Sequence, residues 1–97
     1  MKNHNYYVYI ITNFTRTVLY TGVTNDLSRR MAEHYENRGN LTSFSGRYNC
    51  HILLFWERYS YVKTAIEREK EIKKMSRARK EALIATMNKD WEALDPD

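Results

Sequence analysis

The sequence predicts an α+β fold in which a small antiparallel sheet of three strands is flanked by helices. Three short runs rich in aromatic, β-branched and other apolar residues are typical of strands, and they lie at 6–12, 17–23 and 50–59. Three other segments have the spacing and capping residues of amphipathic helices, at 27–37, 61–75 and 77–87. The predicted order is therefore β-β-α-β-α-α.

Composition limits the class of protein. Ninety-seven residues suit one domain, 1–97, and a chain with 42% hydrophobic and 29% charged residues is not generally disordered. Apolar runs such as Ile52–Trp56 are too short to span a bilayer, and no apolar stretch near the N-terminus predicts an export signal. The single cysteine, Cys50, excludes an internal disulfide. We therefore expect a cytoplasmic protein without a membrane partner.

Positive charge is unevenly distributed along the chain, which carries a net charge of +4. The segment KKMSRARK holds five positive charges and no negative one, on Lys73, Lys74, Arg77, Arg79 and Lys80. Such a segment suits a polyanion because phosphate contacts release counterions, and a solvated helix face is the alternative. A Gly-, Ser- and Asn-rich loop is predicted over 39–48. Arg38 directly precedes it and Arg47 lies within it, and both are available to phosphate.

The first two strands are predicted to form a hairpin through the turn NFTR, residues 13–16. A four-residue loop places Tyr9 directly opposite Tyr20, and Tyr7 opposite Gly22. Two phenols then project side by side from one face of the sheet, next to a gap left by the glycine.

The helix predicted over 27–37 presents an arginine and a histidine at the edge of its buried face. Asn25-Asp26 can cap its first turn. The buried face is expected to hold three residues four positions apart, which are Leu27, Met31 and Tyr35. Arg30 and His34 are also four apart and lie beside that stripe, so both point the same way.

A glutamate falls on the apolar side of the helix predicted over 61–75. The apolar positions of this helix are Val62, Ala65, Ile66 and Ile72. Glu69 lies in the middle of that stripe, where an ionised carboxylate is costly unless a cation or strong donors meet it. Three interpretations stay open: a structural ion pair, a rim position in water, or a ligand of Mg²⁺, which takes oxygen ligands. Ser60 and Ser76 are the predicted N-caps of the last two helices.

Several of these residues stand in a characteristic order. Tyr7-Val8-Tyr9 is followed by Tyr20-Thr21-Gly22, and then by Arg30, His34 and Glu69. This ordered set resembles the GIY-YIG nuclease domain, over about residues 5–88 with a short tail at 89–97. The run EREKEIKKMSRARKEALI further resembles the small stand-alone bacterial members of that superfamily, most of which are uncharacterised.

The resemblance implies a GIY-YIG-like fold and hydrolysis of DNA phosphodiester bonds with one Mg²⁺ (or Mn²⁺) ion, in DNA repair or recombination. Tyr20 would act as general base or bridge to the base water, and Tyr9 would orient it. Arg30 would stabilise charge on the phosphate, and His34 would assist proton transfer or phosphate contact. Glu69 would hold the metal ion. The implied partners are nucleic acid, chiefly DNA, and other repair proteins.

The motifs depart from the family pattern at three positions. Tyr7 stands where the family name has a glycine, although the second motif keeps its glycine, Gly22. Thr21 replaces isoleucine, which is an outward change in the predicted register. Excision-repair members carry a lysine where Val23 stands. Many members also have a late asparagine near the metal site, for which Asn88 is the candidate.

Two other functions stay open from the sequence. A non-catalytic nucleic-acid-binding module would use the basic segment 73–80 on phosphates and the tyrosines on bases. A protein-interaction domain of a repair complex would use Trp56 or Trp91 as an anchor. Each tyrosine, taken alone, is also consistent with ordinary packing in the sheet.

Overall fold

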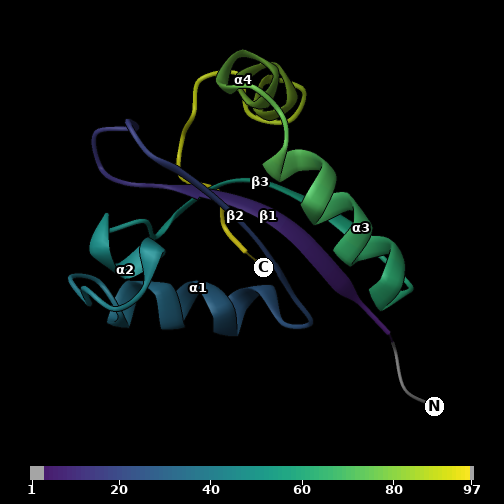
Figure 1. The fold of residues 1–97 in the computed structure, drawn as a ribbon, viewed down its shortest axis with the longest axis horizontal. Coiled ribbons are helices and arrows are strands. Elements are labelled where there is room, and N and C mark those ends of the chain that lie inside the picture. Colours follow the sequence, from purple (N-terminus) through teal and green to yellow (C-terminus); the bar gives the residue numbers. More distant parts are fainter. Residues whose placement is uncertain (1–3, 97) are drawn as a thin grey trace.

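The three predicted strands form one antiparallel sheet in the order β2-β1-β3, in a computed structural model that describes residues 4–96 (Figure 1). The strands are β1 (Tyr6–Thr12), β2 (Leu19–Thr24) and β3 (Ile52–Tyr59). The helices are α1 (Leu27–Glu36), α2 (Phe44–Arg47), α3 (Val62–Lys73) and α4 (Arg77–Ala85). The predicted α+β fold is confirmed, and α2 is an additional element.

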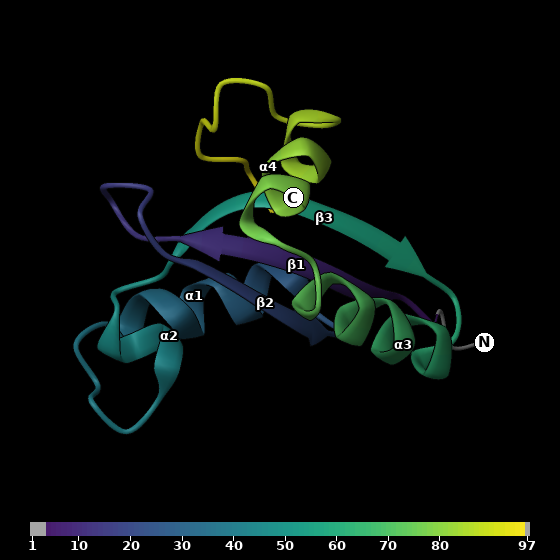
Figure 2. The ribbon, with the colours of Figure 1, turned by 45° about the horizontal axis from the view of Figure 1, so that its top comes forward.

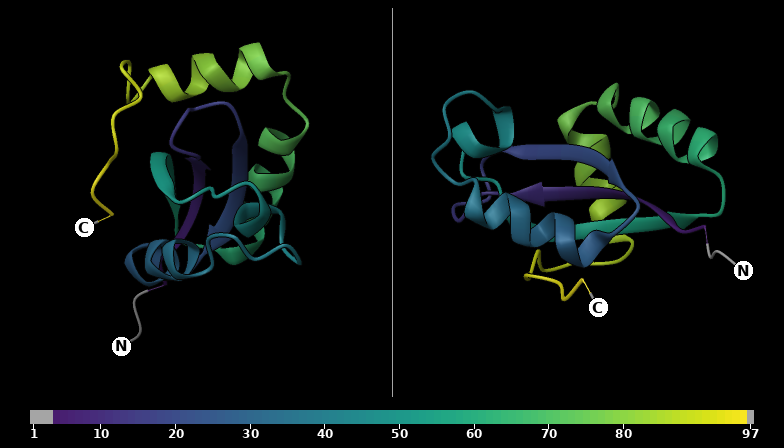
Figure 3. Two further views of the ribbon diagram at one scale, coloured as in Figure 1. Left: turned by 90° about the vertical axis from the view of Figure 1, so that its left-hand side faces the viewer. Right: turned by 90° about the horizontal axis from the view of Figure 1, so that it is seen from below.

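Helices cover both faces of the sheet, so the molecule has three layers (Figure 3). Successive side chains of the central strand β1 point to opposite faces and enter two separate cores. One core lies between the sheet and helices α3 and α4, and it includes Val8, Ile10, Ala65, Ile72 and Ile84. The other lies between the sheet and α1, and it includes Tyr9, Ile11, Leu27 and Met31. The Tyr9 phenol therefore belongs to the α1 side of the molecule.

The predicted register of the β1–β2 hairpin is wrong by two residues. Tyr9 lies opposite Gly22 and not opposite Tyr20. The loop is longer than predicted because the Asn13 side-chain oxygen accepts hydrogen bonds from two backbone N–H groups, those of Thr17 (2.9 Å) and Val18 (3.1 Å). A slip of two residues keeps each side chain on its predicted face, so both phenols still project toward α1.

Side-chain caps begin two of the helices as predicted. The Asp26 carboxylate accepts a hydrogen bond from the backbone N–H of Arg29 (3.0 Å), and the Ser76 hydroxyl accepts one from that of Arg79 (3.2 Å). The prediction of Ser60 as the cap of α3 is wrong. The chain stays extended through the next residue, which becomes the N-cap without a side-chain hydrogen bond.

The segment predicted as a loop over 39–48 contains the short helix α2. The Ser43 hydroxyl caps it by accepting a hydrogen bond from the Gly46 N–H (3.2 Å). A Cβ atom at Gly46 would lie 2.6 Å from the Asn37 carbonyl oxygen, so this close packing requires glycine. Figure 1 shows α2 beside α1, on the same side of the sheet.

The chain after α4 folds back over β3 (Figure 2). Asn88 is buried, and its amide donates to the carbonyl oxygens of Leu54 (3.1 Å) and Glu92 (2.7 Å). The Leu94 N–H donates to the Leu53 carbonyl oxygen (2.9 Å). Asn88 therefore attaches the C-terminal segment to the sheet.

Two further features bear on the class of protein. Among residues 4–96, no helix combines the length and apolar character that crossing a membrane requires. Cys50 is buried in the core on the α1 side, and burial raises the pKa of its thiol to about 11. The thiol is therefore protonated at neutral pH and acts as a core residue.

Candidate active site

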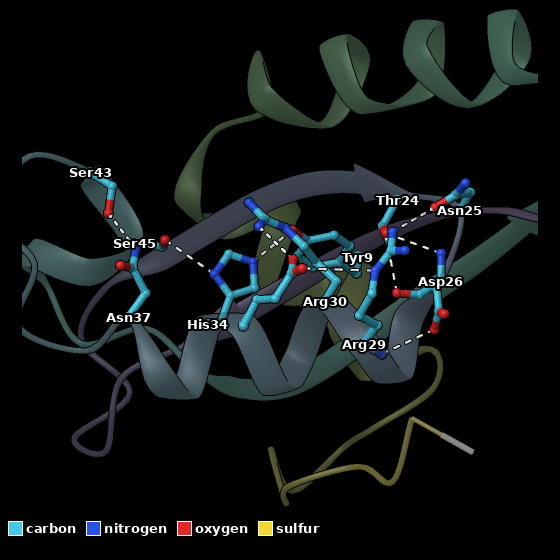
Figure 4. A network of polar contacts seen from close by, with 11 residues as sticks. Tyr9, Thr24, Asn25, Asp26, Arg29, Arg30, His34, Asn37, Ser43 and Ser45 are labelled. Atoms are coloured by element: carbon cyan, nitrogen blue, oxygen red, sulfur yellow. Dashed lines mark hydrogen bonds and ion pairs between the residues drawn. The ribbon is translucent and has the colours of Figure 1, made fainter.

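The Tyr9 phenol is the centre of a cluster of polar side chains on the α1 side of the sheet (Figure 4). Tyr9 is only 1% exposed, and it faces Gly22 on the neighbouring strand. A Cβ atom at position 22 would lie 2.6 Å from Cζ of the phenol ring. Glycine at this position therefore makes the space that the phenol occupies.

Three side chains form a line of hydrogen bonds with the Tyr9 hydroxyl (Figure 4). Nε of Arg30 donates to the hydroxyl oxygen (3.3 Å). The same hydroxyl shares a hydrogen bond with Nε2 of His34 (2.8 Å), and Nδ1 of His34 shares one with the Ser45 hydroxyl (3.2 Å). Helix α1 supplies Arg30 and His34 on one side, as predicted, and α2 supplies Ser45.

Burial determines the protonation of this line. Desolvation raises the pKa of Tyr9 to about 12, although Arg30 opposes the shift. Burial, and then the charge of Arg30, lowers the pKa of His34 to about 4. The phenol and the imidazole are both neutral at neutral pH. A neutral imidazole has one donor and one acceptor nitrogen. The His34 ring can therefore carry its proton on the nitrogen that faces Tyr9 or on the nitrogen that faces Ser45.

The predicted buried face of α1 is wrong at one position. Tyr35 is exposed, whereas His34 is only 2% exposed and follows Leu27 and Met31 into the interior. The histidine can be buried because both of its ring nitrogens have hydrogen-bond partners. A heptad spacing from Leu27 could have indicated position 34. No sequence signal links the histidine to Ser45, since their contact forms across the loop between α1 and α2.

Arg30 and His34 also border a hollow at the surface. This hollow has a volume of about 240 Å³ and is lined by Arg30, Glu33, His34, Glu36 and Asn37. Burial alone would lower the pKa of Arg30, but the Tyr9 hydroxyl and Glu33 raise it overall, so the guanidinium stays charged. Its Nε donates to Tyr9 and its Nη1 to Glu33 (3.1 Å). Among the contacts of residues 4–96, Nη2 remains for an anionic ligand.

Tyr20 lies on the same face of the sheet as Tyr9 and is half-buried. Its ring centroid lies 6.5 Å from that of Tyr9 and 5.6 Å from that of His34. The two phenols therefore come together, although they are not directly paired as the predicted register required. Tyr20 is the more exposed of the two phenols.

Glu69 lies on α3, in the layer opposite to α1. Its side chain is 16% exposed, and the ammonium of Lys73, one turn later, pairs with it at 3.6 Å. The apolar stripe predicted for this helix is only half correct. Its buried members are Ala65 and Ile72, and its exposed members are Val62 and Ile66. Position 69 falls between the two buried residues, which explains why the carboxylate is largely covered.

The Glu69 carboxylate also acts on the tyrosine cluster. Its negative charge is among the smaller causes that raise the pKa of Tyr9. Across residues 4–96, no three His, Cys, Asp or Glu side chains converge as a metal site. A single carboxylate fits Mg²⁺, which is often bound through one or two carboxylates together with phosphate oxygens and water. Glu69 would be the protein ligand of such an ion.

The predicted nucleic-acid-binding residues differ in their surroundings. Arg77 donates to the backbone carbonyl oxygens of Thr17 (3.0 Å) and Arg16 (3.1 Å), so it joins α4 to the β1–β2 loop. Lys73 is the ion-pair partner of Glu69. The other predicted cations are exposed or half-buried, and these are Arg47, Lys74, Arg79 and Lys80. The basic segment is therefore partly a structural feature.

The comparisons with known proteins identify the family. A family model described as the GIY-YIG catalytic domain matches residues 5–82. The chain belongs to the GIY-YIG family. A UPF0213 protein of Natronomonas pharaonis is 41% identical over 81 residues, which cover 84% of this chain and 92% of the relative. A UPF0213 protein of Halobacterium salinarum is 38% identical over 79 residues, covering 81% of this chain and 99% of the relative.

A solved structure supports the same assignment. The solution NMR structure of a UPF0213 protein from Bacillus halodurans is 30% identical, has a TM-score of 0.56 and covers 92% of each chain. The chain is thus a small GIY-YIG protein whose named relatives carry no activity in their names. Membership of the GIY-YIG family places it in a nuclease superfamily, for which the general substrate is nucleic acid.

The structure shows where the residues at all three departures from the GIY-YIG motifs lie. Tyr7, at the position of the motif glycine, packs edge-on against Trp56 with ring centroids 5.9 Å apart. The prediction that Thr21 points outward is wrong. Thr21 is buried opposite Ile10, because this face of β2 is covered by α3. Val23 packs against the same core.

Proposed function

We propose that this GIY-YIG protein is a metal-dependent endonuclease that hydrolyses phosphodiester bonds of DNA in repair or recombination, with Mg²⁺ (or Mn²⁺) as cofactor. The observation that carries the proposal is the line of hydrogen bonds from Arg30 through Tyr9 to His34, beside the more exposed Tyr20. This line combines a cation for phosphate with neutral groups that can hold a proton. A cytoplasmic location, which the single cysteine favours, belongs to the same proposal.

In this mechanism Tyr20, as its phenolate after losing its own proton to solvent, accepts the proton of the attacking water, directly or through a second water. The water oxygen bonds to phosphorus as the bond to the leaving sugar oxygen breaks, and that oxygen takes up a proton from water. A phenol with a pKa of about 10 is a poor base at neutral pH unless nearby cations stabilise its anion. Arg30 is the cation of this cluster that would act in this way. Tyr9 is too deeply buried to serve as the base, and it positions Arg30 and His34 through its hydroxyl.

Arg30 and His34 have different parts in the reaction. Nη2 of Arg30 binds a phosphate oxygen and stabilises the negative charge that develops during attack on phosphorus. His34 stays neutral, and its two ring nitrogens hydrogen-bond the Tyr9 and Ser45 hydroxyls. It can relay a proton along this line only when one hydroxyl receives a proton from the reacting groups as the other hydroxyl gives one up.

Glu69 is the residue that would hold the metal ion. It suits this role because its carboxylate is largely covered and its ion-pair partner among residues 4–96 is Lys73, whose side chain is exposed. When bound, Mg²⁺ supplies a Lewis acid that polarises the phosphate oxygens. The Glu69 carboxylate thereby contributes to the reaction from the α3 layer, whereas the other proposed groups lie on the α1 side.

Cleavage of branched, single-stranded and supercoiled DNA with Mg²⁺ or Mn²⁺ tests this proposal. The variants Tyr20→Phe, Arg30→Ala and Glu69→Gln should each reduce the cleavage rate by about a hundredfold or more, since they remove the proton acceptor, the anion-binding group and the metal ligand. Tyr61→Phe and Glu67→Gln are matched controls at exposed positions, and both should cleave at the wild-type rate.

Cleavage that persists unchanged in Tyr20→Phe and Glu69→Gln would contradict the proposal. Salt-sensitive binding of DNA without cleavage would instead support a non-catalytic nucleic-acid-binding module. The structure does not favour a protein anchor at Trp56 or Trp91. Both are half-buried, one against Tyr7 and the other beneath Arg77.

A further inference from the structure

An exposed row of aromatic rings extends from Tyr20 across α2. The Phe44 ring stacks on the Tyr20 ring at a centroid distance of 6.0 Å and an interplanar angle of 27°. The Tyr48 ring lies 4.8 Å from Phe44, tilted by 51°. Phe44 is 52% exposed and Tyr48 is 42% exposed, although large aromatic side chains normally favour burial. The row therefore offers ring surface to a ligand, directly beside the phenol that we propose as the general base.

The backbone that carries Phe44 and Tyr48 is held in place by burial and by hydrogen bonds. Ser45 and Gly46, which lie between the two exposed rings in the sequence, are both buried. The Gly39 N–H donates to the Gly46 carbonyl oxygen and the Cys50 N–H to that of Ser45, each at 2.8 Å. Figure 4 shows Ser45 pointing toward His34 from this segment. The same four-residue helix thus completes the polar line and holds the aromatic ring of Phe44.

The charge of the surrounding segment suits a nucleic acid strand. Residues 37–56 contain Arg38 and Arg47 but no aspartate or glutamate. The Arg47 guanidinium lies 6.0 Å from the centroid of the Tyr48 ring, within the range of a cation–π contact. An exposed aromatic row with a cation beside it is the combination that binds single-stranded nucleic acid, with bases on the rings and phosphates near the cation.

We propose that the aromatic row Tyr20–Phe44–Tyr48 stacks on an unpaired nucleobase next to the phosphate that is cleaved. This inference rests on the proposed nuclease function and specifies its substrate as single-stranded or locally unpaired nucleic acid. Bases inside an intact duplex are stacked on one another and offer no free face to a ring. The row would place the flanking base on α2 and direct the adjoining phosphate toward Arg30 and Tyr20.

Binding of a fluorescently labelled 12-nucleotide DNA strand, and of a blunt duplex of the same sequence, tests this inference in EDTA and at fixed salt. The single strand should bind more tightly than the duplex. Phe44→Leu should weaken binding of the single strand roughly tenfold, whereas Phe44→Trp should keep it, because stacking requires an aromatic ring. The matched control is Phe14→Leu, at an 80% exposed phenylalanine in the β1–β2 loop, which should bind like the wild type.

A strand with 2-aminopurine in place of adenine provides a second readout. Its fluorescence should be quenched on binding to the wild type and much less on binding to Phe44→Leu or Tyr48→Leu, because stacking quenches this base. Tyr61→Leu, at another exposed tyrosine, should leave the quenching unchanged. Tighter binding of the duplex, or equal binding and quenching by the wild type and Phe44→Leu, would overturn the inference.

These experiments separate the inference from the nuclease proposal, because EDTA prevents cleavage. Binding that depends on Phe44 without any cleavage in Mg²⁺ would leave the aromatic row standing and reject the nuclease. Cleavage that depends on Tyr20 but is unaffected by Phe44→Leu would support the nuclease and reject the role of the aromatic row.

Discussion

Among the individual residues, Tyr9 and Gly22 depend on each other. The phenol fills the space that a side chain at position 22 would take, and its hydroxyl then reaches Arg30 and His34. The glycine of the second motif is therefore needed for the shape of the cluster rather than for a special backbone angle. This physical reason applies whatever reaction the cluster performs.

Replacement of Gly22 by alanine should displace the Tyr9 ring. Because the added Cβ would meet Cζ at 2.6 Å in a buried site, we expect a loss of about 1–3 kcal/mol in the free energy of unfolding, measured by urea denaturation. In a Tyr9→Leu background, which lacks the ring, the same substitution should cost less than about 1 kcal/mol. Equal costs in the two backgrounds would show that the clash is not with this ring.

Among the strands and helices, apolar patterns and caps predicted the elements, and side-chain hydrogen bonds within the loops determined what the patterns missed. The apolar run of β1 and the Asp26 cap of α1 are local signals, and both predictions are confirmed. The hairpin register was wrong because Asn13 uses its side chain on backbone N–H groups of the loop. Helix α2 was missed because four residues show no periodicity, and only its Ser43 cap marks it.

The candidate site was predictable to a similar extent. The spacing of Arg30 and His34 indicated that both point the same way, and the structure joins them through Tyr9. The burial of His34 in place of Tyr35 was not predictable from hydrophobicity, because hydrogen bonds offset the cost of burying the imidazole. Ser45 supplies one of those bonds from a segment with no sequence link to α1.

Helix α4 provides a test of which cations are structural. Arg77 donates to two backbone carbonyl oxygens of the β1–β2 loop and lies 5.6 Å from the centroid of the Trp91 ring. Arg77→Ala should therefore lower the free energy of unfolding by about 1 kcal/mol, measured by thermal denaturation. The matched control Arg79→Ala, at an exposed position of the same helix, should change it by less than about 0.5 kcal/mol. Equal losses in the two variants would contradict this assignment.

In the molecule as a whole, the sheet separates the groups of the proposed site into two layers. Tyr9, Tyr20 and the residues of α1 lie on one side, and Glu69 belongs to the helix on the other. Strand β2 is an edge of the sheet, so groups from both layers can approach a ligand at that edge. The proposed reaction therefore requires the phosphate to lie beside β2, where Tyr20 is half-buried.

The buried histidine makes the stability of the whole fold depend on pH. His34 has a pKa of about 4 in the folded protein, against an ordinary value of 6.5. As the pH falls from 6.5 to 4, the unfolded chain binds a proton at this residue and the folded protein does not. The free energy of unfolding should therefore decrease across this range, by about 2–3 kcal/mol, and the contribution of His34 should level off below pH 4.

Urea denaturation of the wild type and of His34→Gln, from pH 7 to pH 4, measures this contribution. Glutamine keeps hydrogen-bonding groups but cannot be protonated, so the decrease should be smaller in the variant by about 2–3 kcal/mol. The control His51→Gln, outside the cluster, should retain the wild-type decrease.

Glu57 does not obscure the comparison. Burial would raise the pKa of its carboxyl, but Arg68 and Tyr59 lower that pKa overall from the ordinary value of 4.5. The stability that Glu57 contributes is therefore lost as the pH falls below about 4.5, and this loss is the same in all three proteins. A parallel decrease in the wild type and His34→Gln would mean that the imidazole is protonated in the fold without cost.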